Sequence, residues 1–126
     1  MRAWAKGLLG LEAAVELLIG HGVWPARADF AVASLTFCCD GISGAVIAAV
    51  DFEAALAARR AGGLPCSVSQ EQILGLAASI AAGVPVALGD LVCGLDEDNA
   101  VRVAIAVLHA AGFGGRSVLV TRGSRR

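Results

Sequence analysis

Hydrophobic residues in the first part of the chain recur at the three- and four-residue spacing of an amphipathic helix. The members of this stripe are Trp4, Leu8, Leu11, Val15 and Leu18. Gly20 and Gly22 follow, and Pro25 opposes continuation of a helix. The spacing therefore predicts one amphipathic helix over residues 3–20.

Three later helices are predicted from polar residues that can cap a helix start. Asp51 and Asp96 are favourable N-cap residues, and acidic side chains follow each of them in the first turn. Ser67 and Gln70 have the spacing of a capping box. The expected helix ends are the glycines Gly62, Gly63, Gly83 and Gly112. We also expect one or two helical turns over Leu88 to Cys93.

The same spacing predicts which helix faces are buried. In the helix after Ser67 the expected buried stripe is Ile73, Leu76, Ala77 and Ile80. In the helix after Asp96 the expected buried residues are Val101, Ile105 and Leu108. The segments Ala31 to Phe37 and Ala45 to Val50 are rich in β-forming residues and flank a turn-like stretch, which predicts a small hairpin. The fold class predicted is mainly α, a small domain of four or five helices with a minor β-hairpin.

Charge is distributed unevenly along the 126 residues, although the net charge is only −1. Residues 1–115 are net acidic, whereas the last eleven residues carry four arginines and no acid. The arginines are Arg116, Arg122, Arg125 and Arg126. We therefore expect a single helical domain over residues 1–113 and a basic C-terminal tail over 114–126 that could be disordered.

Hydropathy gives no sign of a membrane or secretory segment. No uncharged apolar run reaches the length of a spanning helix. Glu12 and Glu16 interrupt the region where a signal peptide would be uncharged. We expect a cytoplasmic protein with no membrane association.

Three stretches of the chain read AAVELLIGHGVW, VDFEAALAARRAGGLPCS and ILGLAASIAAGVPVALGDLVCGLDEDNAVRVAIAVLHAAG. They resemble a group of small uncharacterised actinobacterial proteins. The likeness covers roughly residues 12–24 and 46–112, and its most specific parts are the steps from Leu64 to Ser67 and from Gly94 to Asp96. In that group Phe52 is often replaced by Trp and Gln70 by Glu. The resemblance supports a stand-alone domain and implies no catalytic residue, because the group has no assigned activity.

The cysteines offer only a remote route to enzyme chemistry. Cys66 precedes the Ser67 cap, where a helix dipole could lower a thiol pKa, and His21 or His109 could then act as base. A thiol-dependent enzyme using Cys66 is therefore the remote alternative. His109 has a simpler explanation, because a protonated imidazole suits the last turn of a helix.

No cofactor and no metal site is predicted. Cys38 and Cys39 are adjacent, and no cysteine pair has a recognised zinc spacing. The acids after Asp96 lack the ligand spacing of a calcium loop and are explained by helix capping. Small apolar side chains in a reduced protein are the default interpretation of the cysteines.

A nucleic-acid-binding accessory protein is the main alternative function. The helices after Asp51 and Ser67 are joined by a short glycine-containing turn, as in a helix-turn-helix pair. The basic tail could contact phosphates. However, the second helix of the pair has no Lys or Arg, the residues that make most base and phosphate contacts.

The function favoured by the sequence is a small non-enzymatic interaction module that self-associates or binds a protein partner. Hydrophobic residues occur on more than one face of the first and last helices, and a small monomer seldom covers so much apolar surface. The candidate interface residues are Leu9, Leu17, Val103 and Val107. The hydrophobic residues that lie off the main buried stripe of these helices thus predict a surface that binds a partner, in addition to the core.

Overall fold

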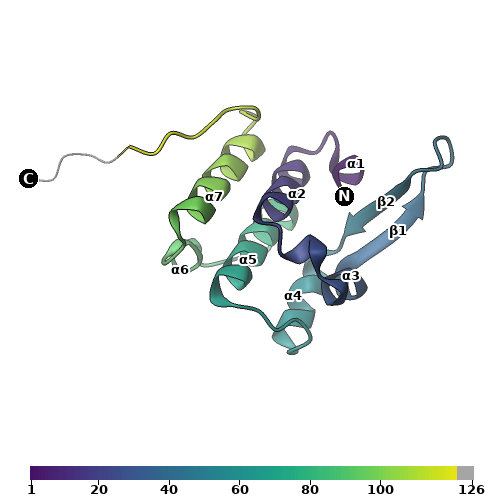
Figure 1. The fold of residues 1–126 in the computed structure, drawn as a ribbon, viewed down its shortest axis with the longest axis horizontal. Helices are drawn as coiled ribbons and strands as arrows, with labels where there is room; N and C mark the ends of the chain where they lie inside the picture. Colours follow the sequence, from purple (N-terminus) through teal and green to yellow (C-terminus); the bar gives the residue numbers. More distant parts are fainter. Residues whose placement is uncertain (122–126) are drawn as a thin grey trace, which may run out of the picture.

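The computed structural model describes residues 1–121 of the chain. In chain order its α-helices are α1 (Arg2–Ala5), α2 (Leu9–His21), α3 (Ala28–Ser34), α4 (Phe52–Arg60), α5 (Val68–Ala82), α6 (Leu88–Val92) and α7 (Glu97–Ala110). A 3₁₀ turn, η1, spans Trp24–Ala26, and the strands are β1 (Leu35–Cys39) and β2 (Val46–Val50). The prediction of a mainly α fold with a minor hairpin is confirmed (Figure 1). None of these helices combines the length and the hydropathy needed to cross a membrane.

Helices α2 and α5 form the centre of the molecule. Helix α2 packs against both α5 and α7, and α5 also contacts α4, α6 and α7. Seven consecutive residues of α5, Gln72–Ala78, are buried, so this helix has no solvent-exposed face over two turns. Gly10 allows the two helices to approach closely, because a Cβ at this position would lie 2.9 Å from the carbonyl oxygen of Ile80. The core is therefore organised around the α2–α5 contact.

The predicted helix starts at Asp51, Ser67 and Asp96 are confirmed. The Asp51 side chain accepts a hydrogen bond from the backbone of Ala54, and Asp96 accepts one from Asn99. Ser67 and Gln70 form the reciprocal bonds of a capping box. Because each cap depends on residues within four positions, the sequence pattern identifies it directly.

The prediction of one helix over residues 3–20 is wrong. The chain breaks after α1 at Gly7, whose φ of 92° lies in the left-handed region that favours glycine. Leu8 then becomes the residue before α2 and is exposed. The break lets the side chain of Glu12 accept a hydrogen bond from the Gly7 backbone at 2.7 Å, which satisfies a donor that a continuous helix would have used.

The segment predicted as the first strand begins instead as helix α3. Phe30 is fully buried in α3, with its ring centroid 5.6 Å from that of Trp24. The Trp24 indole donates a hydrogen bond to the carbonyl of Gln70 at 2.9 Å, which ties this region to α5. Tertiary packing of the two aromatic rings therefore overrides the β-propensity of the segment.

Strands β1 and β2 form an antiparallel pair in which Leu35 lies opposite Val50 and Cys39 opposite Val46. The hairpin is confirmed, but β1 extends to Cys39, so Cys38 and Cys39 belong to the strand and not to the turn. Its root is anchored in the core by Ala48 and Val50, which are buried. Its turn end projects away from the helices (Figure 1).

Two expectations about helix faces are wrong. In α7 the buried residues are Asn99, Val103 and Ala106, whereas Ile105 is exposed. In α2, Leu17 is buried although it lies off the predicted stripe. Because α2 is covered on two sides, by α5 and by α7, a single-stripe pattern underestimates its buried surface.

Candidate functional site

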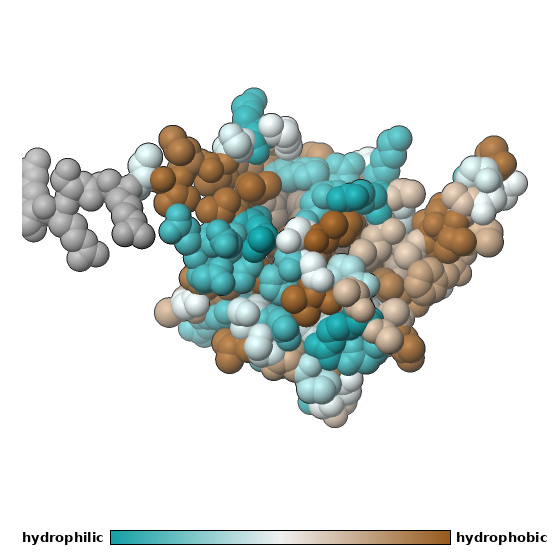
Figure 2. All heavy atoms as spheres, viewed as in Figure 1, coloured by the Kyte–Doolittle hydropathy of each residue, from teal (hydrophilic) through white to brown (hydrophobic). Residues whose placement is uncertain are grey.

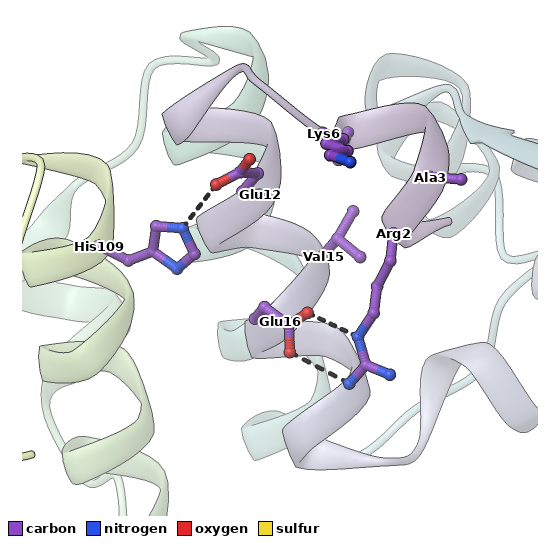
Figure 3. Close-up of a pocket in the computed structure, with 8 residues that line it drawn as sticks. Arg2, Ala3, Lys6, Glu12, Val15, Glu16 and His109 are labelled. Carbon is purple, nitrogen blue, oxygen red and sulfur yellow. Dashed lines mark hydrogen bonds and ion pairs between the residues drawn. The ribbon is translucent and has the colours of Figure 1, made fainter. Parts of the chain in front are cut away.

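Helices α1, α2 and α7 line an open pocket, a cavity of about 300 Å³ that contains several charged side chains (Figure 3). It is lined by Arg2, Ala3, Ala5, Lys6, Glu12, Val15, Glu16 and His109. The break after α1 positions the cavity, because it turns α1 back alongside α2, with which it is in contact. The charged groups therefore come from three separate segments of the chain.

Glu12 and His109 form the central pair of this cavity. The two side chains point toward one another, with 2.9 Å between His109 Nε2 and Glu12 Oε1 (Figure 3). The hydrogen bond to His109 and the one from the Gly7 N–H hold the pKa of Glu12 below its ordinary value. The pair connects the start of α2 to the end of α7, so His109 has a structural role that its helix position alone does not reveal.

Arg2 and Glu16, which also line this pocket, form an ion pair. Arg2 Nε lies 2.6 Å from Glu16 Oε1, and Arg2 Nη2 lies 3.2 Å from Oε2. Both carboxylates of the cavity are thus engaged by basic groups of the chain itself. The arrangement fixes the helices against one another and presents neither a hydroxyl nor a thiol among its lining residues.

Cys66 is half-buried in the loop between α4 and α5 and packs against the core. Burial is the main cause that raises the pKa of its thiol, and the nearby carboxylate of Glu71 acts in the same direction. This direction is opposite to the one that the nucleophile hypothesis requires. His109, one of the two histidines considered as a base for this thiol, is instead hydrogen-bonded to Glu12.

The other cysteines and the acidic residues form no metal site in the part of the chain that the structure describes. Within residues 1–121, no three His, Cys, Asp or Glu side chains gather as a ligand set. Cys38 and Cys39 are exposed on β1, and Cys93 is exposed after α6.

The helix pair considered for DNA binding is α4 and α5. Arg59, near the end of α4, forms an ion pair with Glu71 of α5 at 3.0 Å. One of the few cations near this pair is therefore occupied by an internal carboxylate. In the tail, Arg116 lies over the Phe113 ring at 5.6 Å, and Arg122, Arg125 and Arg126 fall outside the described residues.

The four residues predicted as an interface separate into two groups. Leu17 and Val103 are 3% and 7% exposed, so the expectation that they lie on an open face is wrong. Both belong to the hydrophobic core, and the helices that carry them, α2 and α7, pack against one another. Leu9 and Val107 are exposed and remain candidates.

Apolar surface that the sequence reasoning missed lies on the hairpin. Phe37 is 59% exposed, Val46 67% and Ile42 99%. Figure 2 shows hydrophobic colouring over the projecting hairpin, and again near the chain segment that follows α7. The available signal was the near absence of charge between residues 35 and 50, where Asp40 is the one charged residue.

A scan against protein-family models gives no match, and searches of curated proteins and of solved structures likewise give none.

Proposed function

We propose that the protein is a self-associating, non-enzymatic interaction module and that its hairpin is the main contact surface. The observation that carries this proposal is a two-stranded sheet that projects from the helices with large apolar side chains exposed. A monomer seldom exposes such side chains together without a partner.

The physical argument begins with the instability of an isolated hairpin. Two strands alone are marginally stable in water, and a third strand or a packed layer is normally needed. Here only the root, at Ala48 and Val50, is buried against the body. The part nearer the turn gains stability if further strands or side chains cover it.

The composition of the strands supports the same proposal. Natural proteins protect open strand edges with Lys and other charged residues, or with Pro. Neither β1 nor β2 contains any of these. The edges of this hairpin therefore lack the features that prevent pairing with another chain.

The cysteines fit a cytoplasmic location for the module. The four cysteines are free, and Cys38, Cys39 and Cys93 are exposed. Exposed thiols persist in a reducing compartment, whereas an oxidising one favours disulfides.

Sedimentation velocity of the purified full-length chain across micromolar concentrations tests the proposal. We expect a concentration-dependent dimer or larger species that persists in about 2 M sodium chloride, where the Debye screening length is below about 3 Å. A monomer at every concentration contradicts the proposal.

A titration of the protein into a fluorescent DNA duplex, at matched salt concentrations, distinguishes the nucleic-acid alternative from self-association. Binding through the tail arginines would weaken steeply as salt rises, because it releases counterions. Salt-sensitive DNA binding by a chain that stays monomeric would favour that alternative.

A further inference from the structure

We propose that the open edge of β1 pairs with β1 of a second copy, antiparallel, about a two-fold axis at Cys38. This inference rests on the proposed self-association and names its contact. The result would be one four-stranded antiparallel sheet with the order β2, β1, β1 and β2.

The hydrogen bonds at the ends of the hairpin show which backbone groups point outward. The Asp40 N–H donates to Ala45 and the Asp51 N–H donates to Ser34, each at 2.8 Å. In an antiparallel pair, hydrogen-bonded and non-hydrogen-bonded positions alternate. Thr36 and Cys38 therefore direct their backbone groups toward β2, whereas those of Leu35, Phe37 and Cys39 point away from it.

The exposure of the strand selects the register. Phe37, Cys38 and Cys39 are all exposed, whereas Leu35 is half-buried beside α3. An axis at Cys38 places Phe37 opposite Cys39 of the second copy and uses the outward groups of these two residues alone. In each of the two symmetric Phe37–Cys39 pairs, the two residues could then exchange both backbone N–H···O bonds, as in a hydrogen-bonded pair of an antiparallel sheet.

The chemistry of the edge favours a second copy as its occupant. β1 has the sequence LTFCC and no charge, so two copies meet without repulsion, and nothing on the strand attracts a charged partner. Phe37, Cys39 and Val46 share one face of the hairpin because of the strand register. In the paired sheet Phe37 and Cys39 of one copy lie on this face opposite Cys39 and Phe37 of the other copy.

The size of the contact determines its expected strength. A five-residue strand edge is small beside the roughly 800 Å² that each partner buries in a standard interface. We therefore expect a dimer that dissociates on dilution, not an obligate one.

The register makes a specific prediction for the two adjacent thiols. Cys38 would face its own copy across the axis as a non-hydrogen-bonded pair, where Cβ atoms lie closest, about 4.5–5.5 Å apart. This is near the spacing that a disulfide requires. Cys39 would face Phe37, so two Cys39 thiols would be too far apart to join.

Cross-linking tests this register with two matched proteins. One is C39A/C93A, which keeps Cys38, and the other is C38A/C93A, which keeps Cys39; half-buried Cys66 stays in both. Copper(II)-phenanthroline is the oxidant: two copper(II) ions each accept one electron as two thiols lose their protons and form one disulfide. We expect covalent dimer to form at least about tenfold faster through Cys38, given the closer spacing. Equal rates, faster joining through Cys39 or no dimer from either protein would overturn the register.

A charge at the edge tests the surface without relying on cysteine chemistry. We expect Phe37→Lys to weaken the dimer at least about tenfold, since it removes the apolar contact with Cys39 of the second copy and places two like charges at diagonal positions of the edge. Ile42→Lys is the control, because it adds the same charge in the exposed turn, outside β1. A wild-type dimer that Phe37→Lys leaves unchanged would overturn the edge contact while self-association itself stands. A wild-type monomer would overturn both.

Discussion

Helix α5 and the β1–β2 hairpin are comparable in sequence and opposite in environment. Each is rich in apolar residues and carries one charged residue, Glu71 in α5 and Asp40 in the hairpin. Yet Gln72–Ala78 of α5 are all buried, whereas Phe37, Ile42 and Val46 of the hairpin are exposed. The comparison teaches that an apolar segment with a single charge identifies surface that needs a partner, without saying whether the partner lies in the same chain.

The largest expected effect is on the α5 side of this comparison. Leu74 is fully buried, so Leu74→Ala should lower the free energy of unfolding by about 2–5 kcal/mol through lost burial and a cavity. Chemical denaturation in urea, followed by circular dichroism, measures the change. A loss below about 1 kcal/mol would show that α5 is not the core of the folded protein in solution.

The close approach of α2 and α5 gives the next effect. Gly10→Ala should destabilise the protein by about 1–3 kcal/mol, because the new Cβ would lie 2.9 Å from a backbone carbonyl. Gly20→Ala in the same helix is the control, since its nearest neighbour is the Arg102 side chain at 3.9 Å. There we expect stabilisation of about 0.5–1 kcal/mol from helix propensity. Equal effects at the two glycines would contradict the close contact.

The start of α5 contributes less than its buried face. Ser67→Ala removes the acceptor of the capping box and should cost about 1 kcal/mol. Ser67→Asp keeps an acceptor at the N-cap and should retain most of the wild-type stability. If thermal unfolding shows the two variants to be alike, the cap does not contribute as the geometry indicates.

The Glu12–His109 pair between α2 and α7 should appear as a small pH-dependent effect. Because the folded-state pKa of Glu12 is lowered, its contribution is fully present above the ordinary glutamate pKa of about 4.3. It is then lost as the pH falls through the folded-state pKa. The stability difference between wild type and Glu12→Gln should therefore shrink on acidification below about pH 4. Urea midpoints across this range measure it, with Glu53→Gln on exposed α4 surface as control, and a constant difference would contradict the assignment.

The smallest effect is expected at the hairpin, in dilute solution. Phe37→Ala should change the unfolding free energy of the monomer by no more than about 0.5 kcal/mol, because the ring is mostly solvated. The free energy of unfolding of this variant is measured at micromolar and at higher protein concentrations and compared with that of Leu74→Ala. A cost of several kcal/mol for the dilute monomer would place Phe37 in the core and remove the basis of the proposed surface.

Local chemistry explains what was predictable in the fold. The caps at Asp51, Ser67 and Asp96 and the left-handed glycines that end α2 and α5 depend on residues within one turn of each other. The hairpin was predictable from its two β-rich segments, although its first strand was placed too early. The candidate site was harder to predict from the sequence, because Glu12 and His109 are 97 positions apart.

By itself the sequence determined the starts of α4, α5 and α7, the glycines that end α2 and α5, and the presence of a hairpin, since these follow from backbone hydrogen bonding between near neighbours. Tertiary structure decided the break at Gly7, the helix at Ala28–Ser34 and the burial of Leu17 and Val103. Each of these depends on which distant helix or ring lies alongside. Tertiary structure also decided that the hairpin's apolar residues stay uncovered, because the helices contact one another and leave the β1 edge open.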